Sequence, residues 1–102
     1  MHIISKTHIK KFAAENPQSL PAMDHIIDML QKAEWKNVNE VRAIFPHADE
    51  VEVKSGRKVV VLNAGGNNWR VVVAFHYNRQ KVFILKIMSH AEYSHKKWKQ
   101  IL

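Results

Sequence analysis

The sequence predicts an α+β fold in which two N-terminal helices pack on a twisted, mainly antiparallel β-sheet. The first half of the chain carries apolar residues at helical spacing, and the second half carries β-branched runs separated by short turns. With 102 residues and no cysteine, the chain is long enough to bury one core without disulfides or a metal. We therefore expect a single small domain over residues 1–102.

The first half is predicted to hold a short strand and two main helices. Residues 1–5 are partly β-branched, which predicts the strand. A helix starting at Ser5 or Thr7 should end at Asn16, because the residue before a proline is pushed out of the α region. Ser19 is the expected N-cap of the second helix. The apolar face of that helix follows the i, i+3, i+4, i+7 pattern at Met23, Ile26, Ile27, Leu30 and Ala33.

The rest of the chain is predicted to form a third helix and a meander of antiparallel strands. Asn37 and Glu40 have the spacing of a capping box, so a short helix should begin there and end before Pro46. Strands are expected at residues 50–53, 57–63, 69–77 and 81–88. The first of these alternates like an edge strand, and the last is almost continuously apolar, which suits a central strand.

The stretch from Asn63 to Arg70 contains the only pair of adjacent glycines, Gly65 and Gly66, between two predicted strands. A tight reversal at this point needs residues with positive φ, which glycine supplies. The reversal would leave two amides, an indole and a guanidinium at one end of the sheet, a place to grip an anion or a nucleotide. The plainer alternative is a hairpin with a Gly-rich turn and an arginine that extends from a strand.

The charge of the chain favours a polyanionic partner. Its formal net charge is +7, which suggests nucleic acid or an acidic protein segment, although a basic surface also serves solubility alone. Aromatic residues adjoin cations at Trp69 beside Arg70 and at Trp98 beside Lys97, and this pairing favours RNA. No apolar run approaches the roughly 20 residues of a membrane span. The N-terminus has no signal-like run, so we expect a cytoplasmic protein with no membrane partner.

Antiparallel pairing should bring Arg70 and His90 to the same edge of the sheet, with Tyr93 close behind. These groups suit metal-free RNA cleavage, which needs a proton acceptor, a proton donor and a fixed positive charge on the phosphate. Histidine can transfer protons near neutral pH, and arginine can bind two phosphate oxygens. Taken singly, His90 is more often structural and Tyr93 more often packed. The 7 histidines lack metal-site spacing, so no metal is expected.

At these residues the chain resembles the HigB family of bacterial type II toxins, within the RelE/ParE superfamily. The motif Asn-x-Gly-Gly-Asn-x-x-Arg is present as Asn63, Gly65, Gly66, Asn67 and Arg70. A later His-x-Glu-Tyr motif is present as His90, Glu92 and Tyr93. Residues 1–5, 33–35 and 45–49 also fit the pattern of the family, so the resemblance covers essentially the whole chain.

The resemblance implies a RelE-like domain with ribosome-dependent mRNA endonuclease activity that uses no metal or cofactor. It also implies a HigA-like helix-turn-helix antitoxin as partner, with the toxin a monomer alone and a hetero-oligomer with its antitoxin. Arg70 would bind the phosphate, and His90 and Tyr93 would transfer protons or stack on a base. The predicted RNA-binding residues are Asn63, Gly65, Gly66, Asn67, Trp69, Lys96 and Lys97.

One position departs from the pattern of the family. Many members have aspartate after the tyrosine, where this chain has Ser94, and His95 or Lys96 is the candidate replacement. Two other functions also stay open. One is a ParE-like toxin that is no nuclease and poisons a protein target such as gyrase, and the other is a basic RNA-binding module.

Overall fold

The computed structural model describes residues 1–66, 68–95 and 97–102. The strands are β1 (His2–Ile4), β2 (Asp49–Glu52), β3 (Lys58–Ala64), β4 (Trp69–His76) and β5 (Lys81–Ser89). The helices are α1 (Lys6–Glu15), α2 (Leu20–Lys32), α3 (Val38–Ile44), α4 (His90–Ser94) and α5 (Trp98–Ile101), with 3₁₀ turns η1 (Pro17–Ser19) and η2 (Tyr77–Arg79). The predicted α+β class is confirmed. Within these ranges no helix is long and apolar enough to cross a membrane.

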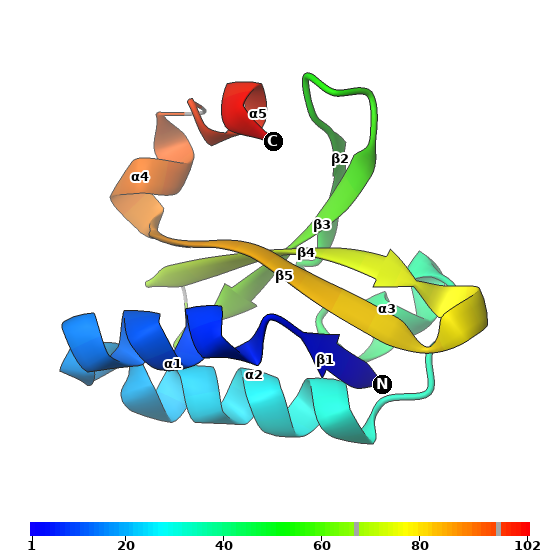
Figure 1. Cartoon of the computed structure of the whole chain (residues 1–102), viewed down its shortest axis with the longest axis horizontal. Coiled ribbons are helices and arrows are strands. Elements are labelled where there is room, and N and C mark those ends of the chain that lie inside the picture. The colour runs from blue at the N-terminus through cyan, green and yellow to red at the C-terminus, as the bar shows by residue number, and fades with distance from the viewer. Residues whose placement is uncertain (67, 96) are drawn as a thin grey trace.

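The five strands form one twisted sheet in the order β1-β5-β4-β3-β2 (Figure 1). The consecutive strands β2 to β5 pair antiparallel, as a meander should, and β1 pairs parallel with β5. The sheet is therefore mainly antiparallel, as predicted. The apolar strand β5 lies between β1 and β4, and the alternating strand β2 lies at an edge, so both of these predictions are also confirmed.

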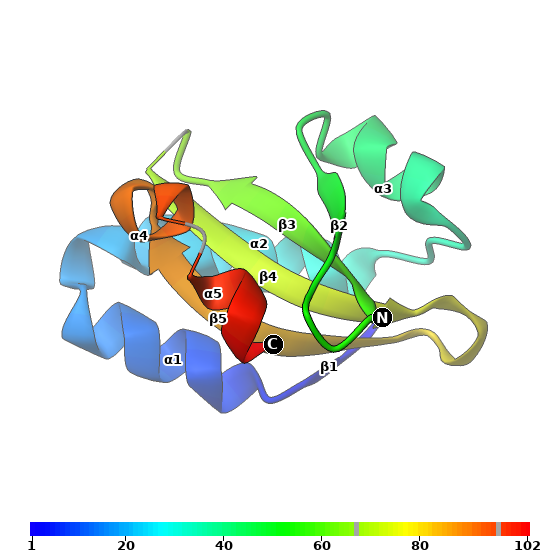
Figure 2. The same cartoon turned by 90° about the horizontal axis from the view of Figure 1, so that it is seen from above.

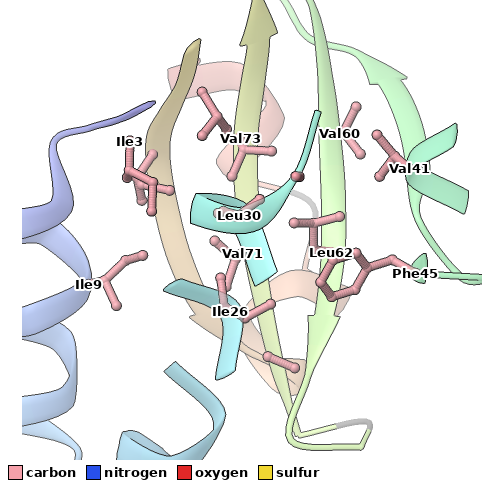
Figure 3. Close-up of a cluster of buried hydrophobic side chains, with 14 of the residues drawn as sticks. Ile3, Ile9, Ile26, Leu30, Val41, Phe45, Val60, Leu62, Val71 and Val73 are labelled. Carbon is pink, nitrogen blue, oxygen red and sulfur yellow. The ribbon is translucent and has the colours of Figure 1, made fainter. Parts of the chain in front are cut away.

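The helices α1 and α2 cover one face of the sheet (Figure 1). Side chains of α2 lie over β4 in the core, where Ile26 and Leu30 are fully buried, as are Val71 and Val73 (Figure 3). Ile9 of α1 completes this part of the core, also with no exposed surface. The apolar faces that the helical and strand periodicities predict pack together here, because each element directs its apolar side chains to the same core.

The opposite face of the sheet is covered in part by the C-terminal segment, which was not predicted to be helical. The helices α4 and α5 lie above this face, and α5 lies beside the β2–β3 hairpin (Figure 2). Trp98 is 2% exposed and anchors a second, smaller core. The backbone amide of Lys54, just after β2, donates to the carbonyl of Lys99 at 3.0 Å and ties the segment to the hairpin. The second core consists of Val53, Val59, Val61, Val72, Met88 and Trp98.

The two predicted helix caps have different outcomes. Ser19 does not cap α2, because the chain enters this helix through η1 and Ser19 already has helical backbone angles. The Ser19 hydroxyl instead donates to the Asn16 carbonyl at 2.7 Å. Asn37 does cap α3, since its side-chain oxygen accepts from the Glu40 amide at 3.1 Å. The Glu40 carboxylate accepts from the amide of Lys36, one residue earlier than a regular capping box requires.

Strand β4 divides its side chains between the two cores, and this division positions the candidate site. Val71 and Val73 belong to the core under α1 and α2, whereas Val72 belongs to the core under the C-terminal segment. Arg70, two residues before Val72, therefore lies on the face with α4 and α5. The pairing with β5 shifts register after Val72, so Leu85 is the extra residue of a bulge.

Candidate active site at the end of the central strands

The Gly-Gly turn between β3 and β4 is packed against the helical layer. Gly65 and Gly66 have φ angles of 60° and 70°, which L side chains rarely adopt. A Cβ atom added to Gly65 would lie 2.9 Å from Cδ1 of Trp69 and 3.2 Å from Cβ of Ala22. Gly65 is therefore required for close packing as well as for backbone conformation, whereas a Cβ atom at Gly66 would meet no atom of the described residues within 4 Å apart from its chain neighbours.

Arg70 is a nearly buried cation, with 6% of its surface exposed. It lies opposite Asn63 of β3 and Met88 of β5, directly after the turn. Its Nη1 atom donates to the carbonyl of Trp69 at 3.1 Å, and its Cζ atom lies 5.2 Å from the ring centroid of Tyr93. These contacts compensate for the loss of water around the guanidinium and fix its orientation.

His90 is the direct neighbour of Arg70 that antiparallel pairing predicts. Nη2 of Arg70 lies 3.1 Å from Nδ1 of His90. Because arginine carries only donors, Nδ1 must accept in this contact, which leaves the proton of the neutral imidazole on Nε2. The His90 side chain is otherwise exposed to solvent, so Nε2 is available to a ligand while Nδ1 is held by Arg70.

A capping box fixes α4, which carries His90 and Tyr93. The Ser89 hydroxyl accepts from the Glu92 amide at 3.2 Å, and the Glu92 carboxylate accepts from the Ser89 amide at 3.4 Å. The amide of His90 donates to the carbonyl of Asn68 in the Gly-Gly turn at 3.0 Å. The glutamate of the His-x-Glu-Tyr motif therefore has a structural role. The Ser-x-x-Glu spacing that signals it is visible in the sequence but was not used in the prediction.

Tyr93 connects Arg70 to the C-terminal segment. Its ring stacks on Trp98 with centroids 5.6 Å apart and an interplanar angle of 22°. The indole of Trp98 donates to the Tyr93 carbonyl at 3.2 Å. From the sequence, Trp98 is interpreted only as an aromatic neighbour of Lys97 that favours RNA, and this anchor is not predicted, although a tryptophan among lysines is itself a signal of burial.

The other predicted RNA-binding residues do not all lie with the Arg70 cluster. Trp69 lies on the opposite face, where its ring meets Phe12 edge-on at 5.4 Å. Asn63 is half-buried beside Arg70 in the register, and Lys97 is exposed. Asn67 and Lys96 lie outside the described residues. The contacts of all these residues with RNA stay predictions.

The residues at the departure from the family motif are close to the cluster. The hydroxyl of Ser94 donates to the carbonyl of His90 at 2.9 Å, so it supports the short helix α4. His95 follows as an exposed residue at the end of that helix. Its proposed replacement of the missing carboxylate stays a prediction.

The arrangement joins a nearly buried guanidinium to an imidazole and a tyrosine ring, on a small sheet covered by two helices. The model of the HigB toxin family, described as the RelE-like toxic component of a toxin-antitoxin system, matches residues 20–96. The chain is 31% identical over 93 residues to an mRNA interferase HigB of Escherichia coli O6:H1 (strain CFT073), covering 91% of this chain and 88% of the relative. The same identity and coverage hold for an mRNA interferase toxin HigB of Escherichia coli K12 and an mRNA interferase HigB of Shigella flexneri.

These matches show the class of the protein, which is a small RelE-like toxin of a toxin-antitoxin pair with an antitoxin as its partner. The chain belongs to the HigB toxin family.

Proposed function

We propose that this chain is an mRNA interferase, an endoribonuclease that inhibits translation by cleaving mRNA on the ribosome without a metal. The contact of Arg70 with His90 and Tyr93 is the observation that carries the proposal. The relatives named as mRNA interferases support it, since they match nearly the whole chain. A toxin that only blocked a protein target would have no need of such a cluster.

The chemistry is a transphosphorylation. The ribose 2′-oxygen attacks the adjacent phosphorus and loses its proton, and the 5′-oxygen of the next nucleotide leaves and gains a proton. The products are a 2′,3′-cyclic phosphate and a 5′-hydroxyl. Arg70 supplies a permanent positive charge for the non-bridging oxygens, on which negative charge grows in the transition state.

An exchange of partners at Arg70 prepares the proton transfer. In the free protein the guanidinium donates to Nδ1 of His90. An incoming phosphate is a stronger acceptor than an imidazole nitrogen, so it takes this donor and releases Nδ1. The released nitrogen accepts the proton of the 2′-hydroxyl, and the Tyr93 hydroxyl protonates the leaving 5′-oxygen. Tyr93 also keeps Arg70 in place through its ring.

The surrounding residues hold the RNA and the partners. The Gly-Gly turn, with Asn63, Asn67 and Arg70, shapes the path of the backbone. The cations Lys96 and Lys97 meet phosphates, and the net charge of +7 favours entry into an RNA-lined cleft of the ribosome. Trp69 packs against Phe12 beside the turn and so supports the site, and its half-buried ring is also proposed to contact the RNA. A HigA-like helix-turn-helix antitoxin in the cytoplasm would hold the monomeric toxin in a hetero-oligomer.

The test is induced expression in a bacterial host, with growth and the 5′ ends of mRNA measured for the wild type and for Arg70→Ala. Arg79→Ala is the matched control, because Arg79 is an exposed arginine in η2 at the far end of β4. We expect growth arrest and new ends inside reading frames for the wild type and the control, and neither for Arg70→Ala. Arg70→Lys, which keeps the charge, should lose most of the cleavage because an ammonium cannot bind two oxygens side by side.

Two results would contradict the proposal. Growth arrest without new mRNA ends would point to a protein target such as gyrase. New ends that persist in a folded Arg70→Ala protein would place the cleavage site elsewhere on the chain.

A further inference from the structure

A cavity of about 260 Å³ lies between β5 and the C-terminal segment, on the same face of the sheet as Arg70. Its walls come from three elements and the turn between α4 and α5. The lining residues are Lys86, Met88, Glu92, His95, Lys97, Trp98 and Ile101. Of the residues that the structure describes, none in the Gly-Gly turn and none of the three proposed catalytic residues lines the cavity, so it is a separate space from the cluster of Arg70, His90 and Tyr93.

The cavity nevertheless adjoins that cluster directly. Met88, fully buried at its floor, is the β5 partner of Arg70 in the sheet register. Lys86, also in the lining, is the partner of Val72, and paired residues of antiparallel strands direct their side chains to the same face. On the other side, Trp98 stacks on Tyr93, whose ring contacts Arg70. A chain bound at Arg70 therefore reaches the cavity within a short distance.

The chemistry of the lining fits one nucleotide. Met88 and Trp98 close the floor with at most 2% of their surfaces exposed, so the apolar surface within reach of a ligand lies mainly at Ile101 at the mouth, which is 75% exposed. Lys86, His95 and Lys97 bring cations or neutral donors, and Glu92 brings a carboxylate that keeps one oxygen, Oε1, in the capping box. Bases combine an apolar ring with polar edges, and their phosphates bind lysine. The volume is below the roughly 300–1,000 Å³ of pockets for drug-sized ligands, so a single nucleotide is the largest suitable unit.

The geometry points to a nucleotide subsite in this cavity, which takes the nucleotide next to the scissile phosphate of the RNA. The base lies against Ile101 at the apolar mouth, and its phosphate lies between Lys86 and Lys97. The edge of the base meets the polar groups of α4 and the following turn, which gives the enzyme a means to prefer one base over another. This inference rests on the proposed function, because it assigns a further part of the substrate to the same face.

The first experiment detects occupancy without any cleavage. The wild-type protein is labelled with ¹⁵N and titrated with adenosine, cytidine, guanosine and uridine 5′-monophosphates, with inorganic phosphate as comparison. We expect shifts of the Trp98 indole N–H and of the Lys97 and Ile101 amides that differ among the four nucleotides. The same shifts with inorganic phosphate, shifts confined to the Gly-Gly turn, or no shift at millimolar concentration would overturn the subsite.

A negative charge introduced at the mouth of the cavity tests whether nucleotides bind there or respond only to the net charge of the protein. Ile101 is 75% exposed, so Ile101→Glu should fold normally, and Leu20→Glu on α2, where Leu20 is 49% exposed, changes the net charge equally on the other face. Ile101→Glu should weaken nucleotide binding about fivefold or more, because like charges at contact distance repel, and Leu20→Glu should not. Equal effects of the two variants would overturn the subsite.

Cleavage by the same variants distinguishes the two proposals. In a reaction on programmed ribosomes, Ile101→Glu should raise KM and leave kcat nearly unchanged, whereas Arg70→Ala should abolish turnover. If the wild-type protein does not cleave RNA, the proposed function fails while the nucleotide titration still decides the subsite. If the wild type cleaves and Ile101→Glu changes neither KM nor the preferred bases at the cut, the subsite alone fails.

Discussion

Arg70 is a permanent cation that is buried in β4, where the next three buried residues are valines. Burying it is tolerable because a backbone carbonyl, an imidazole nitrogen and an aromatic face surround it. The same contacts restrict its rotamers. On the proposed function, this orientation lets Arg70 stabilise the charge that develops on the phosphate without reorganising during the reaction.

Tyr93→Phe tests whether the phenol takes part in the reaction or only holds Arg70. The phenylalanine ring keeps the contact with Arg70 and the stack on Trp98, so stability should change little. Loss of the proton donor should lower the cleavage rate by about 10²-fold or more. The measurement is the single-turnover rate, and a fully active variant would leave Tyr93 as a positioning residue.

Tyr77 offers a test of stability far from the site. Burial raises the pKa of Tyr77 from 10.0 to about 12, with the Glu50 carboxylate adding to the rise and Arg42 opposing it. Because the pKa in the folded state is the higher one, its contribution to stability is complete below pH 10 and is lost as the pH rises through about 12. Among the described residues its buried hydroxyl finds no hydrogen-bond partner.

Tyr77→Phe should therefore be as stable as the wild type at pH 7, or more stable by on the order of 1 kcal/mol. Between pH 10 and 12 its stability should fall less steeply than that of the wild type, as measured by denaturant unfolding at each pH. A variant that is clearly less stable at pH 7 would show that the hydroxyl makes a hydrogen bond in solution.

At the scale of elements, the short helix α4 depends on its cap more than on its length. A helix of five residues is far below the length that is stable alone, so the Ser89–Glu92 capping box and the Trp98 anchor must hold it. His90 and Tyr93 are positioned by this helix, which makes the cap part of the support of the site.

Ser89→Ala should cost about 1 kcal/mol of stability and also lower cleavage, because α4 loses its N-cap. Asn37→Ala is the matched control, since Asn37 caps α3, which contributes no residue to the Arg70 cluster. We expect a similar loss of stability in both variants and a loss of activity only in Ser89→Ala. Equal activities, measured under conditions where both proteins are folded, would show that the cap does not support the site.

The elements that the sequence predicts well are those with a strong repeating pattern. The apolar face of α2 and the alternation of β4 both recur over several turns or residue pairs, so these two elements and their buried faces follow from the sequence. The meeting of Arg70 and His90 also follows, because antiparallel order alone brings the two strand ends together. These predictions needed no knowledge of individual contacts.

The elements that sequence reasoning missed are short or depend on distant partners. The helices α4 and α5 are too short for periodicity, and Trp98 is buried only because Tyr93 and the β2–β3 hairpin meet it. Serine is a residue type that often caps helices. Ser19, however, is the last residue of the 3₁₀ turn η1 and has helical backbone angles instead of the extended backbone that an N-cap requires. The proposed subsite depends on the C-terminal segment and was invisible for the same reason.

At the scale of the whole molecule, the sheet separates two tasks. The face under α1 and α2 carries the larger core, and the face under α4 and α5 carries the Arg70 cluster and the cavity beside it. Figure 1 shows the two helical layers on either side of the sheet. The side chains of β4 alternate between these faces, so one strand contributes both core valines and Arg70, the arginine proposed to bind phosphate. The core under α1 and α2 therefore holds β4 in place, and the polar groups of the site lie outside that core.

The most direct test of this account is the chemical nature of the new RNA ends. Attack by the 2′-oxygen leaves a 5′-hydroxyl, so the downstream fragments should ligate to an adapter only after treatment with a polynucleotide kinase. The Arg70→Ala protein should give no such fragments. Fragments that ligate without the kinase carry a 5′-phosphate, and this result would contradict transphosphorylation by Arg70, His90 and Tyr93.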